Sequence, residues 1–434
     1  MYSELLRIPI NLNGVPLFGF GILLALWLAL SAWGLAVTAR QSGWGASLRA
    51  HLPTILIIAA AIAWLVPKYF PDGVPIRGYG VMVLAGSVAG ILMALHRARQ
   101  ARLAPDEIVG LAVALFLCGI VGARLFFVIE YWDTIRQPDW LSTLKQVLSV
   151  TEGGLVVYGA FIGAMLGFTW YVKRRGLPAL AMSDLIAPSM VIGLAFGRIG
   201  CLLNGCCYGG ETDVPWAVTF PRDRSAEQFS APYADQAAAG RFHGMRISQR
   251  PAPGHSSGRS LVVTQVDRGS PAERAGVAVG DKVAAVNGKT VDNLQGVHEL
   301  LITALAHRQD VELRTPSGEV RRISAVEPPP RCLPVHPTQV YSSVNAALLA
   351  WVLWSYYPFR RREGEVTTLM ITLYPIARFF EEAIRVDEPS VFGTGLSISQ
   401  NISLVLLAVA AGMWRRLRKK PAGRLDFPLT SPAA

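Results

Sequence analysis

Long apolar runs alternate with short polar and basic segments along most of this 434-residue chain. A helix needs about 20 predominantly apolar residues to cross the roughly 30 Å hydrocarbon core of a bilayer, and counting such runs gives about nine spans. The runs lie near residues 15–37, 52–69, 78–95, 107–130, 153–172, 184–203, 338–357, 366–385 and 397–414. The pattern therefore predicts an all-α polytopic membrane protein, whose second span is the shortest.

The pattern changes between the sixth and seventh runs, where the chain reads as a water-soluble segment. From about 240 to 326, short β-like stretches accompany one helical stretch, Gln295–His307. Proline-rich joints at 221–224 and 327–334 bracket this segment and are typical of linkers. We therefore expect a small α+β domain inserted between spans six and seven.

Residues 269–291 of this insert, reading GSPAERAGVAVGDKVAAVNGKTV, resemble the middle of a PDZ domain. The resemblance implies a PDZ domain over 235–327 and, as a further expectation, a peptide ligand for it. The loop that binds a peptide carboxylate in that family would fall at Arg241–Gly244, ahead of a strand at Met245–Gln249. This loop departs from the family's Gly-hydrophobic-Gly-hydrophobic form, so a role as a spacer or packing module remains an alternative.

Composition agrees with a membrane protein and argues against nucleic acid as a partner. Hydrophobic residues make up 52% of the chain and charged residues only 16%, with a mean hydropathy of +0.36. A soluble protein would carry about 25% charged residues. The net charge of +11 comes from basic residues clustered in short loops beside apolar runs, as in membrane proteins. The first run is too long for a cleaved signal sequence and lacks a basic flank, so we expect it to be retained.

The basic loops also predict the orientation of the chain. They alternate along the sequence so that all fall on one side, which is cytoplasmic by the positive-inside rule. Their residues are Arg40, Arg49, His96, Arg97, Arg99, Arg102, Lys173, Arg174, Arg175, Arg360, Arg361, Arg362 and the RRLRKK motif at 415–420. The N-terminus and segment 204–337 then face outward, and the basic tail, 416–434, lies in the cytoplasm.

The first group of candidate functional residues lies in Gly197–Gly210, which reads GRIGCLLNGCCYGG. Here an apolar run meets the insert. Arg198 lies near the membrane boundary, where an arginine is costly unless it snorkels, finds a partner or serves a ligand. Asn204 adds a neutral donor and acceptor, and three cysteines add thiols. A plain helix end with a snorkelling arginine is the alternative interpretation.

A second group lies on the eighth span, where Tyr374, Arg378, Glu382 and Arg385 are spaced i, i+4, i+8 and i+11. At 3.6 residues per turn, this spacing places all four on one helical face, with Glu382 able to bridge both arginines. Such a face must line a polar cavity rather than contact lipid. It is either a self-satisfied ladder or, because arginines outnumber the carboxylate, a cavity for an anion such as phosphate.

Further polar residues begin or interrupt other spans. His336 and Gln339 open the seventh span in the sequence HPTQVY, where proline suits the first turn of a helix. Arg124 lies inside the fourth span and Tyr79 at the start of the third. A histidine at a helix start is often only a cap, but beside Arg198 in an outward-facing mouth it becomes a candidate catalyst.

These motifs together resemble the prolipoprotein diacylglyceryl transferase family. The matches are Tyr79 in RGYG, Arg124 in GARL, Asp184 in DLIAP, GRIG with Asn204, Gly205 and Gly209, HPTQVY at 336–341, and the stripe from Tyr374 to Arg385. The resemblance implies a seven-span core over 74–220 and 334–415. Residues 1–73 then form two additional spans.

The resemblance also implies the chemistry. The family moves a diacylglyceryl group from phosphatidylglycerol to the thiol of a lipobox cysteine in the signal peptide of a prolipoprotein, in the bacterial inner membrane and without a cofactor. We expect Arg198, Arg378, His336 and Tyr79 to be catalytic. The expected substrate-binding residues are Asn204, Tyr374, Glu382, Arg385, Gln339, Arg124 and Tyr158.

The chain departs from the family where a proton acceptor is expected. Many members have a His-Gly-Gly run where this chain has Tyr158-Gly159-Ala160, and a tyrosine is a poor base at neutral pH. His336, or the field of the arginines acting directly on the thiol, are the remaining routes. A non-catalytic relative that binds phospholipid or lipoprotein precursors is the alternative function, whereas the absence of HExxH in the sequence argues against a PDZ-bearing metalloprotease.

The cysteines allow two further interpretations. Cys201, Cys206 and Cys207 with His336 could supply four metal ligands, or two of the thiols could form a disulfide in an oxidising space. However, the spacing C-x4-C-C is not a usual zinc pattern, and adjacent cysteines seldom both bind one ion. The sequence therefore predicts no metal site.

Overall fold

The computed structural model describes residues 4–12, 14–149, 154, 156–225, 228–251, 259–385, 391 and 394–423. Contacts divide the chain into two compact units, Tyr2–Val81 and Met82–Ala434. Of the expected basic tail, the part after residue 423 lies outside the described residues, as does part of the expected PDZ domain, 252–258.

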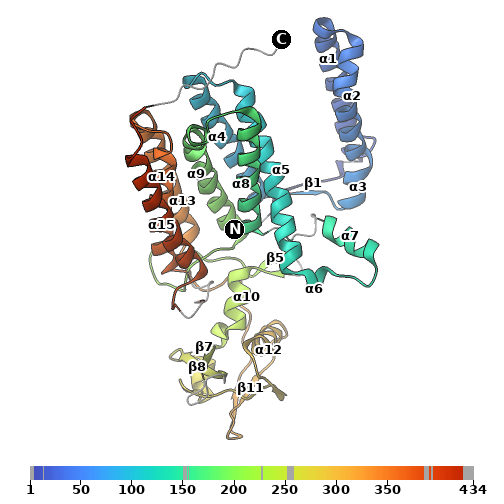
Figure 1. Ribbon diagram of the computed structural model, residues 1–434. Coiled ribbons are helices and arrows are strands. Elements are labelled where there is room, and N and C mark those ends of the chain that lie inside the picture. Colours follow the sequence, from blue (N-terminus) through green and yellow to red (C-terminus); the bar gives the residue numbers. More distant parts are fainter. Residues whose placement is uncertain are drawn as a thin grey trace. The chain divides into compact units, whose positions relative to one another are not determined.

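The N-terminal unit contains a helical hairpin. α1 (Ile22–Ser42) and α2 (Trp44–Ala60) pack side by side (Figure 1), and the chain reverses at Gly43, whose φ is +80°. The Trp27 indole N–H donates to the carbonyl of Ile55 at 3.2 Å and so links the two helices. The other elements are β1 (Glu4–Ile8), which pairs antiparallel with β4 (Val74–Arg77), the pair β2 (Asn11–Leu12) and β3 (Val15–Pro16), a π-helical turn (Ala61–Leu65) and α3 (Val66–Tyr69).

The larger unit contains a bundle of long helices. α5 packs on α8, α9 on α13, and α14 on both α13 and α15 (Figure 1). Its helices are α4 (Gly78–Gln100, which begins in the N-terminal unit), α5 (Pro105–Glu130), α8 (Val157–Arg175), α9 (Ala179–Asn204), α13 (Thr338–Tyr356), α14 (Glu365–Glu382) and α15 (Ile398–Arg418), with the short α6 (Trp132–Ile135) and α7 (Trp140–Leu148). Large apolar side chains such as Ile129, Phe161 and Leu166 are exposed on the bundle, as expected where helices contact lipid.

The nine expected spans all contain helix, but their lengths and polarity differ. Six helices within the described residues are long and apolar enough to cross a membrane. They are 22–40, 44–69, 78–100, 105–130, 179–204 and 398–418. The expected spans at α8, α13 and α14 stay predictions, since α8 ends in three basic residues and α14 carries several charges. The first helix begins at Ile22 rather than near Val15, because Val15 and Pro16 form β3.

Glycines let α5 and α8 pack backbone to backbone. A Cβ added to Gly122 would lie 2.4 Å from the carbonyl oxygen of Gly159, and one added to Gly163 would lie 2.1 Å from that of Cys118. No side chain fits at these distances, so the seam depends on glycine, as in small-residue contacts between membrane helices.

Asp184, fully buried near the start of α9, joins that helix to the start of α14. Its carboxylate accepts hydrogen bonds from the backbone N–H groups of Gly364 (2.7 Å) and Thr367 (2.8 Å) and from the Thr367 hydroxyl (2.9 Å). The guanidinium of Arg360 lies 4.0 Å away. A carboxylate suits the free N–H groups at a helix start, so Asp184 anchors the bundle.

The insert between α9 and α13 is an α+β segment with its own apolar core. β9, β10, β11 and β12 form an antiparallel sheet in the order β10-β9-β11-β12, and β7 pairs with β8. The elements are β5 (Asp223–Ser225), β6 (Gln228–Phe229), α10 (Ala231–Ala238), β7 (Met245–Pro251), β8 (Arg259–Val266), α11 (Pro271–Arg274), β9 (Ala285–Val286), β10 (Lys289–Thr290), α12 (Leu294–Ala306), β11 (Val311–Arg314) and β12 (Val320–Ile323). The expected α+β character is therefore seen, and the expected helix at Gln295–His307 is α12.

The two connections of the insert run side by side. Phe220 and Cys332 exchange hydrogen bonds, since the Cys332 N–H donates to the Phe220 carbonyl (2.9 Å) and the Phe220 N–H to the Cys332 Sγ (3.0 Å). Pro221 and Arg331 form the next antiparallel bridge. The insert thus leaves and rejoins the bundle at one place.

Candidate active site

The end of α9 places the Arg198 region beside the start of α13. The helix ends at Gly205, whose left-handed conformation (φ +73°) suits a glycine C-cap. Two residues later, Cys207 also has a positive φ of 58°, which is uncommon for a residue with a side chain. The chain therefore folds back tightly just after the helix.

The N-terminus of α13 holds this turn in place. The Gln339 side-chain amide donates to the carbonyl of Cys206 at 2.7 Å, and the Thr338 hydroxyl donates to that of Cys207, also at 2.7 Å. The backbone N–H of Gly209 donates to the His336 carbonyl (3.0 Å). Gln339 is fully buried, so its position is set by packing as well as by this bond.

Three thiols converge in the turn. The sulfur atoms of Cys201, Cys206 and Cys207 lie within 4.8 Å of one another, and Asn204 donates to the Cys206 sulfur at 3.5 Å. His336, the fourth ligand considered from the sequence, does not belong to this group of sulfur atoms.

Two expected site residues lie close in sequence or in backbone pairing to the turn that carries these thiols. Arg198 precedes Cys201 by three residues on α9. Arg385 lies just after α14, where its backbone forms an antiparallel bridge with Gly209. The structure thus brings Arg198 and Arg385 to the same turn.

The predicted Arg–Glu–Arg arrangement is confirmed as a set of ion pairs. The Glu382 Oε2 lies 2.6 Å from the Arg378 Nη1 and 3.7 Å from the Arg385 Nε. The exposed fraction of the side chain is 11% for Arg378, 6% for Arg385 and 3% for Glu382, so all three are largely buried. Arg378 also donates to the Ser399 hydroxyl of α15 at 3.0 Å. Arg385 does not lie on the predicted helical face, because α14 ends at Glu382 and Arg385 is reached through a turn.

Arg198 differs from these two arginines. It is only partly buried, and among the described residues it makes no hydrogen bond or ion pair. Among the described residues no carboxylate pairs with the Arg198 guanidinium, whereas Arg378 and Arg385 both pair with Glu382. A guanidinium in this position suits an anion such as a phosphate.

His336 belongs to a short polar chain at the same end of α13. Its Nδ1 lies 3.4 Å from the Tyr341 hydroxyl, which accepts a hydrogen bond from the Trp216 indole N–H at 2.7 Å. If Nδ1 carries the proton toward Tyr341, Nε2 keeps a lone pair and can accept a proton from a substrate.

The sequence patterns did not predict a side-chain link between α13 and α14. The Ser342 hydroxyl and the Asn345 amide donate to the two carboxylate oxygens of Glu381, at 2.7 and 3.3 Å. Glu381 lies off the predicted stripe on α14. The only local signal for its partners is that Ser342 and Asn345, three residues apart, are both polar and lie on one face of α13. The Trp216–Tyr341 bond likewise crosses 125 residues and has no local signal.

Other expected site residues lie elsewhere or have different partners. Arg124 is buried and donates to backbone carbonyls of Gln146 (2.6 Å), Val147 (2.9 Å) and Gly154 (3.0 Å), so it joins α5 to the end of α7 and to Gly154. Tyr374 is partly buried and packs against the apolar core of the bundle. Tyr158 lies half-exposed at the start of α8, and Tyr79 belongs to the N-terminal unit. Substrate contacts by these four stay predictions.

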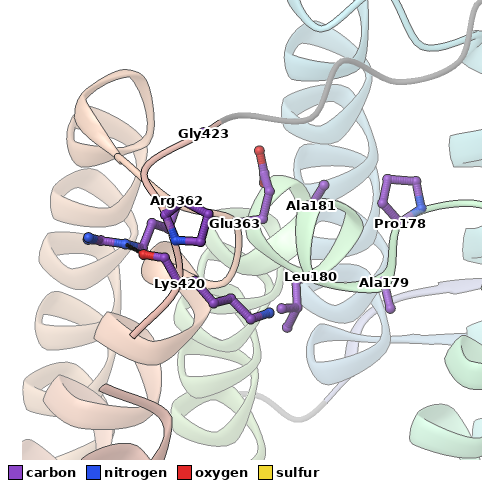
Figure 2. Close-up of a pocket in the computed structure, with 9 residues that line it drawn as sticks. Pro178, Ala179, Leu180, Ala181, Arg362, Glu363, Lys420 and Gly423 are labelled. Atoms are coloured by element: carbon purple, nitrogen blue, oxygen red, sulfur yellow. Dashed lines mark hydrogen bonds between the residues drawn. The ribbon is translucent and has the colours of Figure 1, made fainter. Parts of the chain in front are cut away.

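A cavity of about 290 Å³ lies at the other end of α9. Figure 2 shows its lining, with Leu180 and Ala181 from the start of α9 opposite Arg362 and Lys420. The Arg362 Nε donates to the Lys420 carbonyl at 2.8 Å. With a rise of 1.5 Å per residue, this cavity is about 35 Å from the thiols along the helix, so it is separate from the candidate site.

Comparison with known families matches residues 67–416 to the prolipoprotein diacylglyceryl transferase family. The chain belongs to this family. A relative from Rhodopirellula baltica, named phosphatidylglycerol–prolipoprotein diacylglyceryl transferase, is 34% identical over 94% of this chain and 88% of its own length. Relatives of the same enzyme name from Acaryochloris marina (35% identical) and, as transferase 2, from Clostridium perfringens (33% identical) each match 36% of this chain, and 56% and 58% of their own lengths. The family resemblance seen in the motifs is therefore confirmed.

Proposed function

We propose that this chain transfers a diacylglyceryl group from phosphatidylglycerol to the thiol of the lipobox cysteine in prolipoproteins, the first step of bacterial lipoprotein maturation. Family membership and the enzyme names of its relatives support the reaction. The observation that carries the assignment of the site is Arg198, a partly buried guanidinium without an ion pair among the described residues, near the end of α9 that adjoins the start of α13.

In this proposal the arginines bind the phosphate of the lipid and stabilise its departure. The thiolate attacks the glyceryl carbon bonded to the phosphate, an S–C bond forms, and the C–O bond breaks to release glycerol phosphate. Negative charge grows on the leaving phosphate, and preorganised guanidinium groups at Arg198 and Arg378 lower the barrier. Glu382 orients Arg378 and Arg385 through its two ion pairs.

The remaining residues have supporting roles. His336 takes the thiol proton through Nε2, with Tyr341 holding Nδ1. Asn204 and Gln339 position the turn after α9 through their contacts with Cys206. Tyr79 contributes to catalysis, and Arg124, Tyr158 and Tyr374 contribute to substrate binding.

For the insert, we propose a PDZ domain that packs on the outer side of the enzyme rather than one that captures a peptide. Arg241, in the loop expected to bind a carboxylate, is already paired with Glu211 (2.9 Å) and Asp267 (2.9 Å). The same loop forms a 3-10 turn between two left-handed glycines, Gly240 and Gly244. These pairings support the packing role over a peptide ligand.

The proposed location is the bacterial inner membrane, with the N-terminus and insert outside and the C-terminus in the cytoplasm. A cysteine introduced by Ser317→Cys should react with a membrane-impermeant thiol reagent in spheroplasts, whereas one introduced by Arg361→Cys should not. The opposite labelling pattern would mean that the chain has one span more or fewer than proposed.

The transferase activity is tested by expressing this chain in bacteria depleted of their own transferase. Restored lipid labelling of a lipobox protein supports the proposal, and the same protein with its lipobox cysteine replaced by serine is the control. Normal membrane insertion without labelling would instead identify a non-catalytic relative that binds lipid or precursor.

A further inference from the structure

We propose that Cys201, Cys206 and Cys207 bind one thiophilic divalent cation, Zn²⁺, and that the thiol receiving the lipid is its fourth ligand. This inference rests on the transferase function proposed above. It adds a metal site to the chain and assigns the activation of the nucleophile to it.

The spacing of the thiols suits such a site. The three sulfur atoms already lie within 4.8 Å of one another. Zn–S bonds of about 2.3 Å in a tetrahedral site place sulfur atoms about 3.8 Å apart, so small side-chain rotations close the cluster. Thiolate sulfur is the ligand that selects Zn²⁺ over the hard cations Mg²⁺ and Ca²⁺.

The local backbone answers the objection that adjacent cysteines rarely bind one ion. In extended or helical backbone, neighbouring side chains point in different directions. Cys207, however, has a positive φ of 58°, and this turn brings its sulfur to the same side as that of Cys206. A non-glycine residue in this conformation is a strained choice, of the kind that functional sites retain.

Polar groups outside the cluster fix the two adjacent cysteines. Gln339 donates a hydrogen bond to the Cys206 carbonyl and Thr338 donates one to the Cys207 carbonyl, each at 2.7 Å. Asn204 donates to the Cys206 sulfur. Hydrogen bonds of this kind orient metal ligands and tune the charge on the sulfur. The same α13 residues that seal the turn thus also preorganise the thiols.

The fourth coordination position is open. Among the described residues, no histidine, aspartate or glutamate joins the three sulfurs, and the His336 ring instead contacts Tyr341. Three protein ligands with an open position are typical of catalytic rather than structural zinc. Arg198, three residues before Cys201 on α9, and Arg385, whose backbone bridges Gly209, are positive groups that would offset part of the negative charge of the thiolates.

The chemistry is consistent with transfer to sulfur. The lipobox thiol loses its proton to solvent or to His336 as it binds Zn²⁺, because a coordinated thiol is deprotonated. The bound thiolate attacks the glyceryl carbon, its S–C bond forms, and the C–O bond to phosphate breaks with its electron pair on the leaving oxygen. The product thioether is a weaker ligand and leaves the metal. The metal would lower the pKa of the bound thiol, and His336 would still be able to accept its proton.

The first test is the metal content of the full chain purified in detergent without chelators. We expect about one Zn²⁺ per chain, lost in Cys201→Ser, Cys206→Ser and Cys207→Ser. The matched controls Cys118→Ser and Cys332→Ser, outside the cluster, should keep it. In the wild type, bound Zn²⁺ should also protect three thiols from alkylation, a measurement that does not depend on the folding of a variant. Wild-type protein without Zn²⁺, or a disulfide between two of the three cysteines in mass spectrometry, would overturn the site.

The second test separates this proposal from the proposed function. Adding a lipobox peptide to Co²⁺-substituted protein should change the cobalt–thiolate absorption, and a peptide with serine in place of the cysteine should not. Full lipid transfer by the chain with Cys201, Cys206 and Cys207 all replaced by serine would overturn the metal role and leave the transferase function intact. Zn²⁺ bound at the cysteines with an unchanged cobalt spectrum would overturn the role of the substrate thiol as fourth ligand.

Discussion

Two arginine clusters in this chain differ in how their guanidinium groups are paired. In the insert, Arg241 and Arg246 pair with Glu211 and Asp267 at 2.9–3.0 Å, so two positive charges meet two negative ones. Through these ion pairs, Glu211 in the turn after α9 is joined to Arg241 in the loop before β7 and to Arg246 in β7 itself. Every guanidinium there has a carboxylate partner.

In the bundle, the pairing is different. Arg378 and Arg385 pair with Glu382, but Arg198 has no ion pair among the described residues. Inside a protein an unpaired charge is costly, and a chain that retains it gains something else from it. The comparison teaches that a guanidinium without a carboxylate partner, rather than the presence of arginine, distinguishes a binding site from a structural ion-pair cluster.

Removing Arg198 or Arg378 should have the largest effect. We expect Arg198→Ala and Arg378→Ala each to reduce transfer by about 100- to 1,000-fold, the loss typical of a removed transition-state donor. Release of glycerol phosphate by purified protein is the measurement. Lysine at either position should also be much worse than arginine, because it lacks the bidentate fork. Near wild-type rates for both alanine variants would show that the bundle cluster is not the anion site.

His336 tests whether the arginines act alone. If it is the base, His336→Ala should lower transfer by at least about 100-fold, the lower limit of general-base effects. Release of glycerol phosphate by the purified variant is the measurement. Unchanged activity in His336→Ala would make His336 a helix cap.

The balanced cluster should respond in stability instead. Arg241→Ala removes the ion-pair partner of Asp267 and one of the two partners of Glu211, which keeps Arg246. Because Asp267 is partly exposed, we expect a cost of about 2 kcal/mol, as for hydrogen bonds to charged groups. We expect lower protection of the insert in hydrogen exchange, with transfer to a lipobox peptide changed less than about twofold. Arg246→Ala, at a half-exposed position, is the matched control and should have a smaller effect. A large loss of transfer in Arg241→Ala would place the insert in the catalytic cycle.

His243 makes the stability of the insert sensitive to acid. The ring is fully buried, and burial lowers the pKa of His243 to about 4, below its usual 6.5. The unfolded segment therefore binds a proton that the folded one does not, and stability falls as pH drops below about 6.5. At pH 5 the loss is about 2 kcal/mol. Hydrogen exchange between pH 7 and 5 measures it, and His243→Leu should remove this dependence; an unchanged slope in that variant would exclude His243 as its source.

Tyr158 should have the smallest effect. Tyr158→Phe removes one hydroxyl, and a hydrogen bond is worth about 1 kcal/mol, so transfer should fall less than about tenfold. The rate of glycerol phosphate release at saturating lipid is the measurement. A loss as large as that in His336→Ala would make the Tyr158 hydroxyl, rather than His336, the group that moves the proton.

Local spacing predicted much of the fold and part of the site. The apolar runs located each long helix, and the i, i+4 spacing of Arg378 and Glu382 predicted their ion pair because both lie on one helix. The end of α14 before Arg385 was not predictable, since Ala383 and Ile384 are compatible with helix. The partners of Arg124 and the convergence of the cysteines depend on chain turns and on contacts distant in sequence, which no local pattern encodes.

The paired connections at Phe220 and Cys332 have a consequence for the history of the chain. A module whose entry and exit lie side by side can be gained or lost in one genetic event without separating the flanking halves of the protein. In a shortened gene that joins residue 221 directly to residue 331, the new peptide connection would link two residues that are already paired neighbours in the present chain. Insertion at this point is therefore an easy route by which a membrane enzyme acquires an accessory domain.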